Sequence, residues 1–577
     1  MAGRFALARF LKNYKKQSII SPLFKMLEAS FELAVPLIMA WLIDSGVRGG
    51  DKGVILTAGG WMLAMGVLGL ACSLTAQYFA AVAGMGFGAE LRAALFSHIG
   101  RLSAAEVDKV GASTLITRVT NDVDRAQAGV NLVLRLLLRS PFIALGAVAM
   151  ALTIDVPLTL IFVLTMAAIS VAIYLVISGT LPGYRRIQAQ LDRLSLLARE
   201  NLRGVRVIRA FSRQRDEARR FDAEAENMMR AQIAVGRVAA LNNPLTYALV
   251  NLGIAGILWF GGIRADGGAI SQGQLIALVN YMSQILLALM AVANLIVTVS
   301  RALASAARIE ELFAAQTSVP DGPGARPVPG SARVEFDGVD FAFTPGRNAL
   351  TGVSFRAMPG ETVGVIGGTG AGKSTLANLI PRLYDATAGR VKVDGADVKD
   401  YRLDDLRRRV GLVPQRASLF TGTIRDNLKW GGEDAPDEAL WRALRVAQAE
   451  DFVRALPQGL DSPVEQGGVN FSGGQRQRLT IARALVLEPD ILILDDSASA
   501  LDYLTDARLR KALREETKGM TAFVVTQRVA AIKNADRILV LADGRLAAQG
   551  VHDELYETSE VYRAICDAQT TGEVAGR

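Results

Sequence analysis

The sequence predicts a multidomain chain in which an all-α transmembrane domain of six helices is followed by an α/β P-loop nucleotide-binding domain. Three observations predict this fold class. Long apolar segments crowd the first half, a run rich in proline and glycine follows them, and a glycine-rich phosphate-binding motif lies downstream. A chain of 577 residues is also too long for one hydrophobic core. We expect a transmembrane domain over residues 1–314, a linker over 315–330 and a nucleotide-binding domain over 331–577.

The apolar segments of the first half are long enough to cross a bilayer, because a spanning helix needs about 20 mostly apolar residues. Polar breaks separate the segments from one another. The connections over 84–130 and 180–242 are long, charged and helical in pattern, whereas the other connections are short. The predicted spans are residues 19–44, 54–83, 131–152, 156–179, 243–263 and 274–299.

Basic residues indicate how the predicted membrane domain is oriented. Thirteen arginines lie between Arg185 and Arg237, so the positive-inside rule places the N-terminus and the long connections in the cytoplasm. An even number of spans returns the C-terminal domain to the same side. We attribute the formal charge of +8 to basic residues that set the membrane orientation and contact lipid head groups. The sequence has no basic stripe with interleaved aromatic residues, so it does not predict nucleic-acid binding. Cys72 and Cys566 are the only cysteines, so no disulfide framework or zinc cluster is available.

A phosphate-binding loop is the strongest local motif. GGTGAGKS (367–374) matches G-x-x-x-x-G-K-[ST] and lies between the strand pattern ETVGVI and the helix-like STLANLIPRL. Its backbone N–H groups would surround phosphate oxygens of ATP, Lys373 would reach the terminal phosphates, and the Ser374 hydroxyl would bind Mg²⁺. The predicted loop residues are Gly367, Gly368, Thr369, Gly370, Ala371, Gly372, Lys373, Ser374 and Thr375.

Two further stretches complete a nucleotide-binding pattern. FSGGQRQR (471–478) precedes a helical run, and ILILD (491–495) brings Asp495 to a strand end, where a carboxylate can hold the magnesium of a bound nucleotide. With the P-loop and SALD (499–502), their order and spacing resemble the nucleotide-binding domain of an ATP-binding cassette (ABC) transporter. With six spans ahead of this domain, the chain resembles a half-transporter of the exporter-type fold over residues 15–560.

The resemblance implies roles for individual residues. Phe343 would stack on adenine, although packing of Phe341 and Phe343 in the core is the alternative. Gln415 would contact magnesium together with Ser374 and Asp495. The signature at 472–475 would close over the γ-phosphate bound to the opposite domain, because a helix N-terminus with small residues lets backbone N–H groups approach phosphate. The implied nucleotide-site residues outside the P-loop are Phe343, Gln415, Ser472, Gly473, Gly474, Gln475, Asp495 and Asp502.

Two catalytic positions depart from the family pattern. The residue after Asp495 is usually a glutamate that polarises the attacking water, but here it is Asp496. One missing methylene withdraws the carboxylate by on the order of 1.5 Å, and a misplacement of about 1 Å can cost ~10²-fold in rate. Gln527 occupies the position of a histidine that contacts the γ-phosphate, and glutamine cannot become cationic near neutral pH. His98 and His552 are the only histidines, and neither can substitute there.

These departures, beside an intact P-loop and signature, resemble the degenerate ATP site of heterodimeric bacterial multidrug exporters. The resemblance implies a subunit that binds Mg-ATP, hydrolyses it slowly, and supplies FSGGQ to the competent site of a second ABC half-transporter chain. It also implies a multi-pass protein of a bacterial cell membrane, with its N-terminus and nucleotide-binding domain in the cytoplasm. VTNDVDR (119–125) and ENLRGVRVIRAF (200–211) resemble loops that dock on nucleotide domains. Two alternatives stay open: a nucleotide-gated regulatory or structural membrane subunit, and a homodimeric ABC transporter.

The cargo stays open within the class of amphipathic compounds such as drugs, lipids or peptides, and the fold is compatible with export and with import. Arg135 and Arg139 share a helical face of the third span. They would either line an anion-attracting cavity, or reach the membrane interface or pair with carboxylates. Asn280 and Gln284 in the last span would either line a cavity or form polar contacts between helices.

Overall fold

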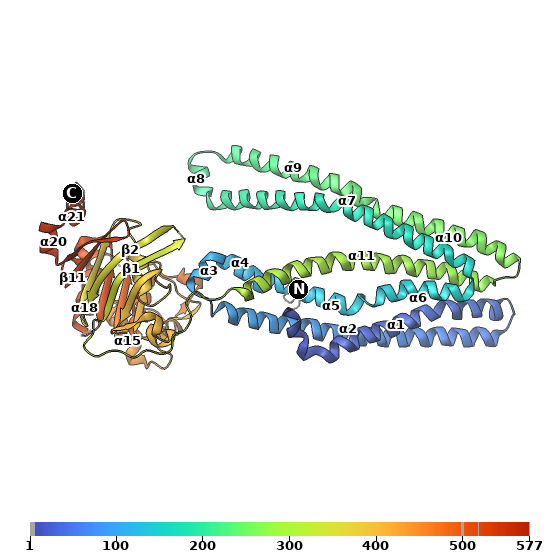
Figure 1. The fold of residues 1–577 in the computed structure, drawn as a ribbon, viewed down its shortest axis with the longest axis horizontal. Coiled ribbons are helices and arrows are strands. Elements are labelled where there is room, and N and C mark those ends of the chain that lie inside the picture. Colours follow the sequence, from blue (N-terminus) through green and yellow to red (C-terminus); the bar gives the residue numbers. More distant parts are fainter. Residues whose placement is uncertain (1–5, 345, 498–500, 517–518, 576–577) are drawn as a thin grey trace. The chain divides into compact units, whose positions relative to one another are not determined.

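Two compact units make up the chain, whose computed structural model describes residues 6–344, 346–497, 501–516 and 519–575 (Figure 1). The first unit contains the chain up to His98 together with Ser113–Ala314. The second unit contains Ile99–Ala112 together with the chain from Ala315 onward. A short stretch of the first long connection therefore folds with the C-terminal part of the chain.

Helices build the first unit, and within the described residues six helical stretches are long and apolar enough to cross a membrane. This confirms the predicted all-α domain of six spans. The spans predicted over 54–83 and 156–179 are parts of longer helices, α2 (Lys52–Ile99) and α7 (Val156–Arg203), because their charged continuations keep a helical pattern. The remaining helices are η1 (Ala6–Tyr14), α1 (Lys15–Trp41), η2 (Leu42–Val47), α4 (Ala112–Thr117), η3 (Arg118–Asp122), α5 (Val123–Leu136), α6 (Arg139–Ile154), α8 (Val205–Ala210), α9 (Gln214–Ala240), α10 (Asn242–Asp266) and α11 (Gln272–Ala314).

Small side chains let the helices of the first unit approach one another closely. Ala29 of α1, Ala147 of α6 and Ala277 of α11 are fully buried. A Cβ added to Gly146 of α6 would lie 2.4 Å from Leu33 Cδ1 of α1. Such contacts are typical of membrane helices, whose association depends on close van der Waals packing. Larger side chains at these positions would push the helices apart.

Strands form the centre of the second unit. They are β1 (Val334–Thr344), β2 (Arg347–Ala357), β3 (Thr362–Gly367), β4 (Ala388–Val393), β5 (Ala396–Asp397), β6 (Val410–Val413), β7 (Gly422–Thr423), β8 (Pro463–Val464), β9 (Ile491–Asp495), β10 (Thr521–Val525), β11 (Arg537–Ala542) and β12 (Arg545–Gly550). A sheet of order β12-β11-β3-β10-β9-β6 is parallel except at its edge strand β12. A second sheet, of order β2-β1-β4-β5, is antiparallel. The combination with the helices below confirms the predicted α/β class of this part.

Helices surround these sheets. The P-loop helix α12 (Lys373–Leu379) is short: its C-cap Ile380 still has helical dihedral angles, but the next residue, Pro381, has no backbone N–H to continue the helix. The other helices of the unit are α3 (Ala104–Val110), η4 (Val398–Asp400), α13 (Leu403–Arg408), α14 (Ile424–Lys429), α15 (Asp437–Val446), α16 (Glu450–Arg454), η5 (Gly459–Asp461), η6 (Gln466–Gly468), α17 (Gly473–Val486), α18 (Tyr503–Glu516), α19 (Val529–Ile532), α20 (His552–Thr558) and α21 (Glu560–Ala575).

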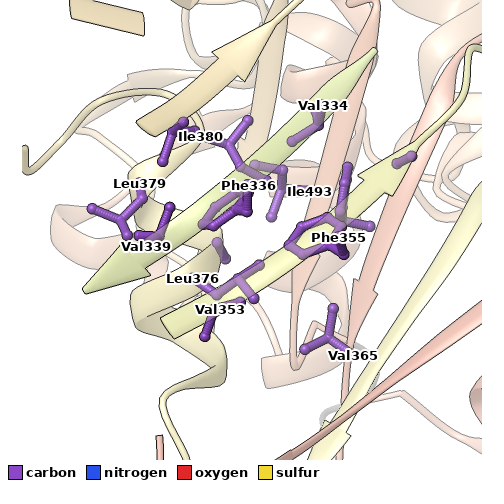
Figure 2. Close-up of a cluster of buried hydrophobic side chains, with 14 of the residues drawn as sticks. Val334, Phe336, Val339, Val353, Phe355, Val365, Leu376, Leu379, Ile380 and Ile493 are labelled. Carbon is purple, nitrogen blue, oxygen red and sulfur yellow. The ribbon is translucent and has the colours of Figure 1, made fainter. Parts of the chain in front are cut away.

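A hydrophobic core joins the two sheets to the P-loop helix (Figure 2). Phe336 of β1 and Phe355 of β2 are paired across the antiparallel ladder, and their rings stack with centroids 4.7 Å apart. Figure 2 shows these rings among Leu376 and Ile380, at the P-loop helix, and Ile493 of β9. The core therefore packs α12 against the two sheets through Leu376, Leu379 and the following Ile380.

Hydrogen bonds attach the segment Ile99–Ala112 to the rest of the second unit. Ser103 caps α3 with Glu106, and its Oγ lies 3.0 Å from Ser318 Oγ. Asp108 Oδ2 accepts a hydrogen bond of 2.7 Å from the Tyr384 hydroxyl. Burial and the Asp108 carboxylate raise the pKa of Tyr384 to about 12, so this tyrosine remains a hydrogen-bond donor at neutral pH.

Candidate nucleotide-binding site

The register of three parallel strands brings the P-loop, Asp496 and Gln527 to one edge of the sheet. Val525 of β10 lies level with Val365 of β3 and with Asp495 of β9. Because the carboxyl ends of parallel strands meet at the same edge, the P-loop after β3, Asp496 after β9 and Gln527 after β10 lie close together. The predicted site is thus formed by segments that are far apart in the sequence.

The P-loop turns through backbone conformations that need glycine. Gly370 and Gly372 have φ values of +80° and +95°, which residues with a Cβ rarely adopt. A Cβ at Gly372 would also lie 2.6 Å from the Ala349 carbonyl oxygen. Residues 367–372 therefore form a tight turn that leads directly into α12, where helix N-terminal N–H groups are available to an anion.

Lys373 points back into the loop. Its Nζ donates hydrogen bonds to the Gly367 oxygen at 2.9 Å and to the Gly368 oxygen at 2.8 Å. Burial lowers the pKa of Lys373, while the charges of Asp496 and Asp495 act in the opposite direction. The Lys373 ammonium group is therefore already placed in the loop, and phosphate oxygens of a bound nucleotide would replace the two carbonyl oxygens as its hydrogen-bond partners.

Oxygen ligands suited to magnesium lie beside the loop. Ser374 Oγ donates to Asp495 Oδ1 at 3.0 Å, and Asp495 is only 7 % exposed. Burial raises the pKa of Asp495, and the Ser374 hydrogen bond opposes that rise. Gln415 lies two residues beyond Val413, which pairs with Leu494, so it falls at the same edge with an exposed side chain. Mg²⁺ usually binds through one or two protein oxygens together with substrate phosphates and water molecules, so these residues fit the ion.

Asp496 has an uncommon backbone conformation. Its φ is +45°, a left-handed region that aspartate tolerates better than most residues, and its N–H donates to the Val525 oxygen at 2.8 Å. Burial is the main cause of the pKa shifts of Lys373 (lowered) and Asp495 (raised), and the Asp496 charge acts upward on both, so its carboxylate is part of the electrostatics of the P-loop. The strand pairing therefore fixes where this side chain starts, and its length decides how far it reaches.

The structure places Gln527 and Asp502 differently. Gln527 is exposed directly after Thr526, whose N–H donates to the Val365 oxygen of β3 at 3.0 Å. Asp502 caps α18, because its carboxylate accepts from the Thr505 N–H at 2.9 Å and from the Thr505 hydroxyl at 2.7 Å. Residues 499–500 of the SALD stretch, and residue 498 before them, lie outside the described residues.

The signature residues form the start of a helix. Ser472 is the N-cap of α17 and forms a capping box with Gln475: its backbone N–H donates to Gln475 Oε1 at 2.9 Å. Ser472 and Gly473 are exposed, so the N–H groups of the first turn are accessible. Phe471 is buried and packs near Phe452, with ring centroids 6.4 Å apart. The helix that begins with the signature therefore packs in a hydrophobic cluster separate from the cluster around the P-loop helix.

The two phenylalanines at the end of β1 have different environments. Phe341 is 5 % exposed and belongs to the core, whereas Phe343 is 61 % exposed. Phe341 and Tyr384 meet Phe343 edge to face, with centroids 4.7 Å and 5.4 Å away. An aromatic ring supported at its edges and exposed to solvent is a suitable platform for a base. Tyr384 is a contributor that sequence reasoning missed, because no motif marks it.

Replacing Phe343 by alanine is expected to weaken ATP binding by about tenfold or more, because stacking on an aromatic ring contributes roughly 1–3 kcal/mol per base. Phe343→Trp should keep the affinity, since tryptophan offers a larger ring. Equilibrium binding of ATP and of inorganic triphosphate distinguishes the two parts of the ligand. The alanine variant should bind triphosphate normally, and equal losses for both ligands would contradict the stacking role.

Polar residues of the membrane unit pair with one another. Arg139 Nη2 lies 2.7 Å from Glu32 Oε2 and 3.8 Å from Glu28 Oε1, which corresponds to the carboxylate pairing considered above. Gln284 Nε2 donates to the Glu32 backbone oxygen at 3.3 Å and joins α11 to α1. Asn280 donates to the Ile276 oxygen of its own helix at 3.1 Å, and Arg135 is partly buried.

A P-loop domain with a capped signature helix, in one chain with six membrane-spanning helices, defines a transport ATPase of the membrane. The ABC transporter transmembrane region family matches residues 18–289, and the ABC transporter family of ATP-binding domains matches residues 350–499. The chain is 37 % identical over 577 residues to an uncharacterised ABC transporter ATP-binding protein of Mycobacterium tuberculosis, covering 99 % of each chain. It belongs to the ABC transporter family.

Other relatives agree with this assignment. An ATP-dependent lipid A-core flippase of Chromobacterium violaceum is 33 % identical over 569 residues, which cover 98 % of this chain and 96 % of the flippase. A solved structure of a bacterial Atm1-family ABC exporter with ATP bound superposes with a TM-score of 0.79 at 25 % identity, covering 96 % of this chain and 98 % of that chain. The protein is thus a multi-pass membrane ATPase with the exporter-type fold, it uses ATP with Mg²⁺, and its nucleotide-binding domain is cytoplasmic.

Proposed function

We propose that this chain is one subunit of a heterodimeric exporter of amphipathic compounds, in which its own ATP site binds Mg-ATP but hydrolyses it slowly. The observation that carries the proposal is the combination of complete binding groups with Asp496. Lys373 and Ser374 already lie beside Asp495 and the loop carbonyls, so the groups that hold nucleotide are in place.

The Asp496 carboxylate is too short to reach the water that attacks the γ-phosphate. The backbone of Asp496 is fixed by its hydrogen bond to Val525 and by its left-handed φ, so the short side chain cannot be advanced by a backbone shift at low cost. A glutamate at this position would extend about 1.5 Å further, and an error of about 1 Å in a catalytic group costs ~10²-fold. Gln527 can donate a hydrogen bond but cannot supply positive charge near neutral pH.

Two surfaces support association with a second ABC half-transporter. The signature at the start of α17 is exposed, as a group that completes another chain's ATP site must be. In the membrane unit, α7 and α9 lie side by side and are joined near α8 (Figure 1). Leu202, Val207 and Phe211 around α8 are exposed apolar side chains. An apolar helix tip at the end of a long hairpin is suited to docking on a partner.

Lipid-like compounds are the cargo class that we favour within the amphipathic range. Two of the relatives carry the name lipid A-core flippase. In this chain, Lys25 lies 2.5 Å from Glu28 and 3.0 Å from Ser73 Oγ, and Arg139 pairs with Glu32. Charged residues inside a membrane domain commonly mark a polar pathway, so a substrate with a charged head and apolar tails matches this part of the unit.

Purification of the chain alone and with a co-expressed ABC half-transporter bearing the catalytic glutamate and histidine tests the proposal. We expect slow ATP turnover by the chain alone, and substrate-stimulated turnover by the pair that survives Asp496→Asn in this chain. Lys373→Ala serves as the binding-deficient control. Rapid hydrolysis by a homodimer of this chain, lost on mutation of Asp496, would overturn the heterodimer and favour a homodimeric transporter.

A further inference from the structure

The backbone around Gln527 is held by a glutamine of the C-terminal helix. We name residues 526–529 the switch segment. Gln569 of α21 donates from Nε2 to the Gln527 backbone oxygen at 2.6 Å and accepts at Oε1 from the Val529 N–H at 2.9 Å. A backbone N–H can only donate and a carbonyl can only accept, so the two partners fix the orientation of the amide. One side chain therefore bridges the backbone on both sides of Arg528.

The position of Gln569 on α21 explains why a polar residue stands there. Tyr562, Cys566 and Gln569 are spaced i, i+4 and i+7, so they share one helical face. Tyr562 is 0 % exposed, and Tyr562 and Cys566 pack in one cluster with Val529 and Ile532 of α19. This apolar stripe leads Gln569 to the switch segment. A partly buried side-chain amide beside this apolar stripe needs hydrogen-bond partners, and the backbone of the switch segment provides them.

The two hydrogen bonds of Gln569 complete the support of the switch segment. On the upstream side, the Thr526 N–H donates to Val365 of β3 at 3.0 Å. On the downstream side, Arg510 of α18 donates to the Ala530 oxygen at 2.7 Å. Between them, Val529 begins α19, and its N-cap residue provides no side-chain hydrogen bond. Gln569 thus satisfies a helix-start N–H that would otherwise lack a partner from the cap.

We propose that Gln569 is a positioning residue for ATP: it fixes the backbone at Gln527 so that the Gln527 side chain is directed toward the γ-phosphate. The inference rests on the proposed placement of Gln527 at the γ-phosphate. It assigns to the C-terminal helix a part in distinguishing ATP from ADP, because ADP has no γ-phosphate for Gln527 to contact. Both hydrogen-bond partners of Gln569 are backbone atoms of the switch segment, so its effect on nucleotide binding would pass through that segment.

Equilibrium binding to the purified full-length chain, with magnesium and either ADP or a non-hydrolysable ATP analogue, tests the proposal. Gln569→Ala should raise the Kd for the ATP analogue by about fivefold and leave the Kd for ADP unchanged. Gln569→Met keeps the length and packing of the side chain but removes both hydrogen bonds, so it should give the same selective loss. Equal losses for both nucleotides, or no loss with either variant, would overturn the positioning role.

Two further variants make the outcome specific. Tyr556→Phe removes a hydrogen bond of 3.0 Å from α20 to Asp567 of α21 without touching the switch segment, and it should leave both Kd values unchanged. Gln527→Ala should show the same selective loss as Gln569→Ala. If Gln527→Ala is selective and Gln569→Ala is not, the bridge alone is refuted. If neither variant is selective, the placement of Gln527 at the γ-phosphate is refuted as well.

Discussion

Asp496→Glu is expected to raise the rate of ATP hydrolysis by the purified chain by on the order of 10²-fold. The restored methylene carries the carboxylate to the place where it can orient the attacking water, and positioning errors of about 1 Å have effects of this size. The rest of the site is already arranged, since Ser374 and Asp495 are 3.0 Å apart and Lys373 points into the loop. Because the signature is also intact, two copies of the variant lack only the histidine that Gln527 replaces, so the gain measures the effect of carboxylate reach alone. Phosphate release under saturating Mg-ATP measures the gain.

Asp496→Gln is the matched control for this gain. Glutamine has the length of glutamate but cannot accept a proton from water at neutral pH, so the rate should stay at or below that of the unmodified chain. Both variants should bind ATP with nearly unchanged affinity. A rate for Asp496→Glu within a few-fold of the starting rate would show that carboxylate reach does not limit this site.

Gly367→Ala is expected to destabilise the nucleotide-binding unit and to abolish ATP binding. A Cβ at this position would lie 2.2 Å from the Leu541 backbone oxygen, in the strand that pairs with β3 at Gly367 itself. Because the obstacle is backbone, no side-chain rotation relieves it, and strand and loop must both shift. Overpacking of this kind costs about 1–3 kcal/mol and sometimes more. Thermal unfolding and nucleotide binding by the full chain measure the two effects.

The neighbouring glycine supplies an internal comparison. A Cβ at Gly368 would meet no heavy atom within 4 Å, and its φ lies outside the left-handed region. Gly368→Ala should therefore unfold at the same temperature as the unmodified chain. Similar unfolding temperatures for the Gly367 and Gly368 variants would contradict the steric explanation.

The parts of the fold that the sequence predicted are those set by local pattern. Apolar runs of bilayer length and the glycine pattern of the P-loop identify themselves without any knowledge of distant contacts. The helical pattern of the connections over 84–130 and 180–242 was also visible in the sequence, but no local signal showed that α2 and α7 run without a break from the apolar segments into these connections. Asp502 could not be assigned from the sequence for another reason. An aspartate at this position is compatible both with a nucleotide site and with the N-cap that it forms on α18.

Residues that act through distant contacts left no local signal. Tyr384 and Asp108 are separated by 276 positions, and Gln569 lies 42 positions beyond Gln527. No spacing rule connects such pairs, because their meeting depends on the packing of whole segments. The left-handed backbone of Asp496 and its hydrogen bond to Val525 of β10 likewise have no signal in the ILILDD sequence.

The attachment of Ile99–Ala112 to the C-terminal part of the chain has a practical consequence for fragments. A polypeptide excised at Ala315 would lose the Asp108 carboxylate and the Ser103 hydroxyl that face Tyr384 and Ser318. The Tyr384 hydroxyl, whose ring packs against Phe343, would then lose its carboxylate partner. Nucleotide affinities measured on such a fragment would come from a unit that lacks these contacts. Binding and activity should therefore be measured on the full-length chain.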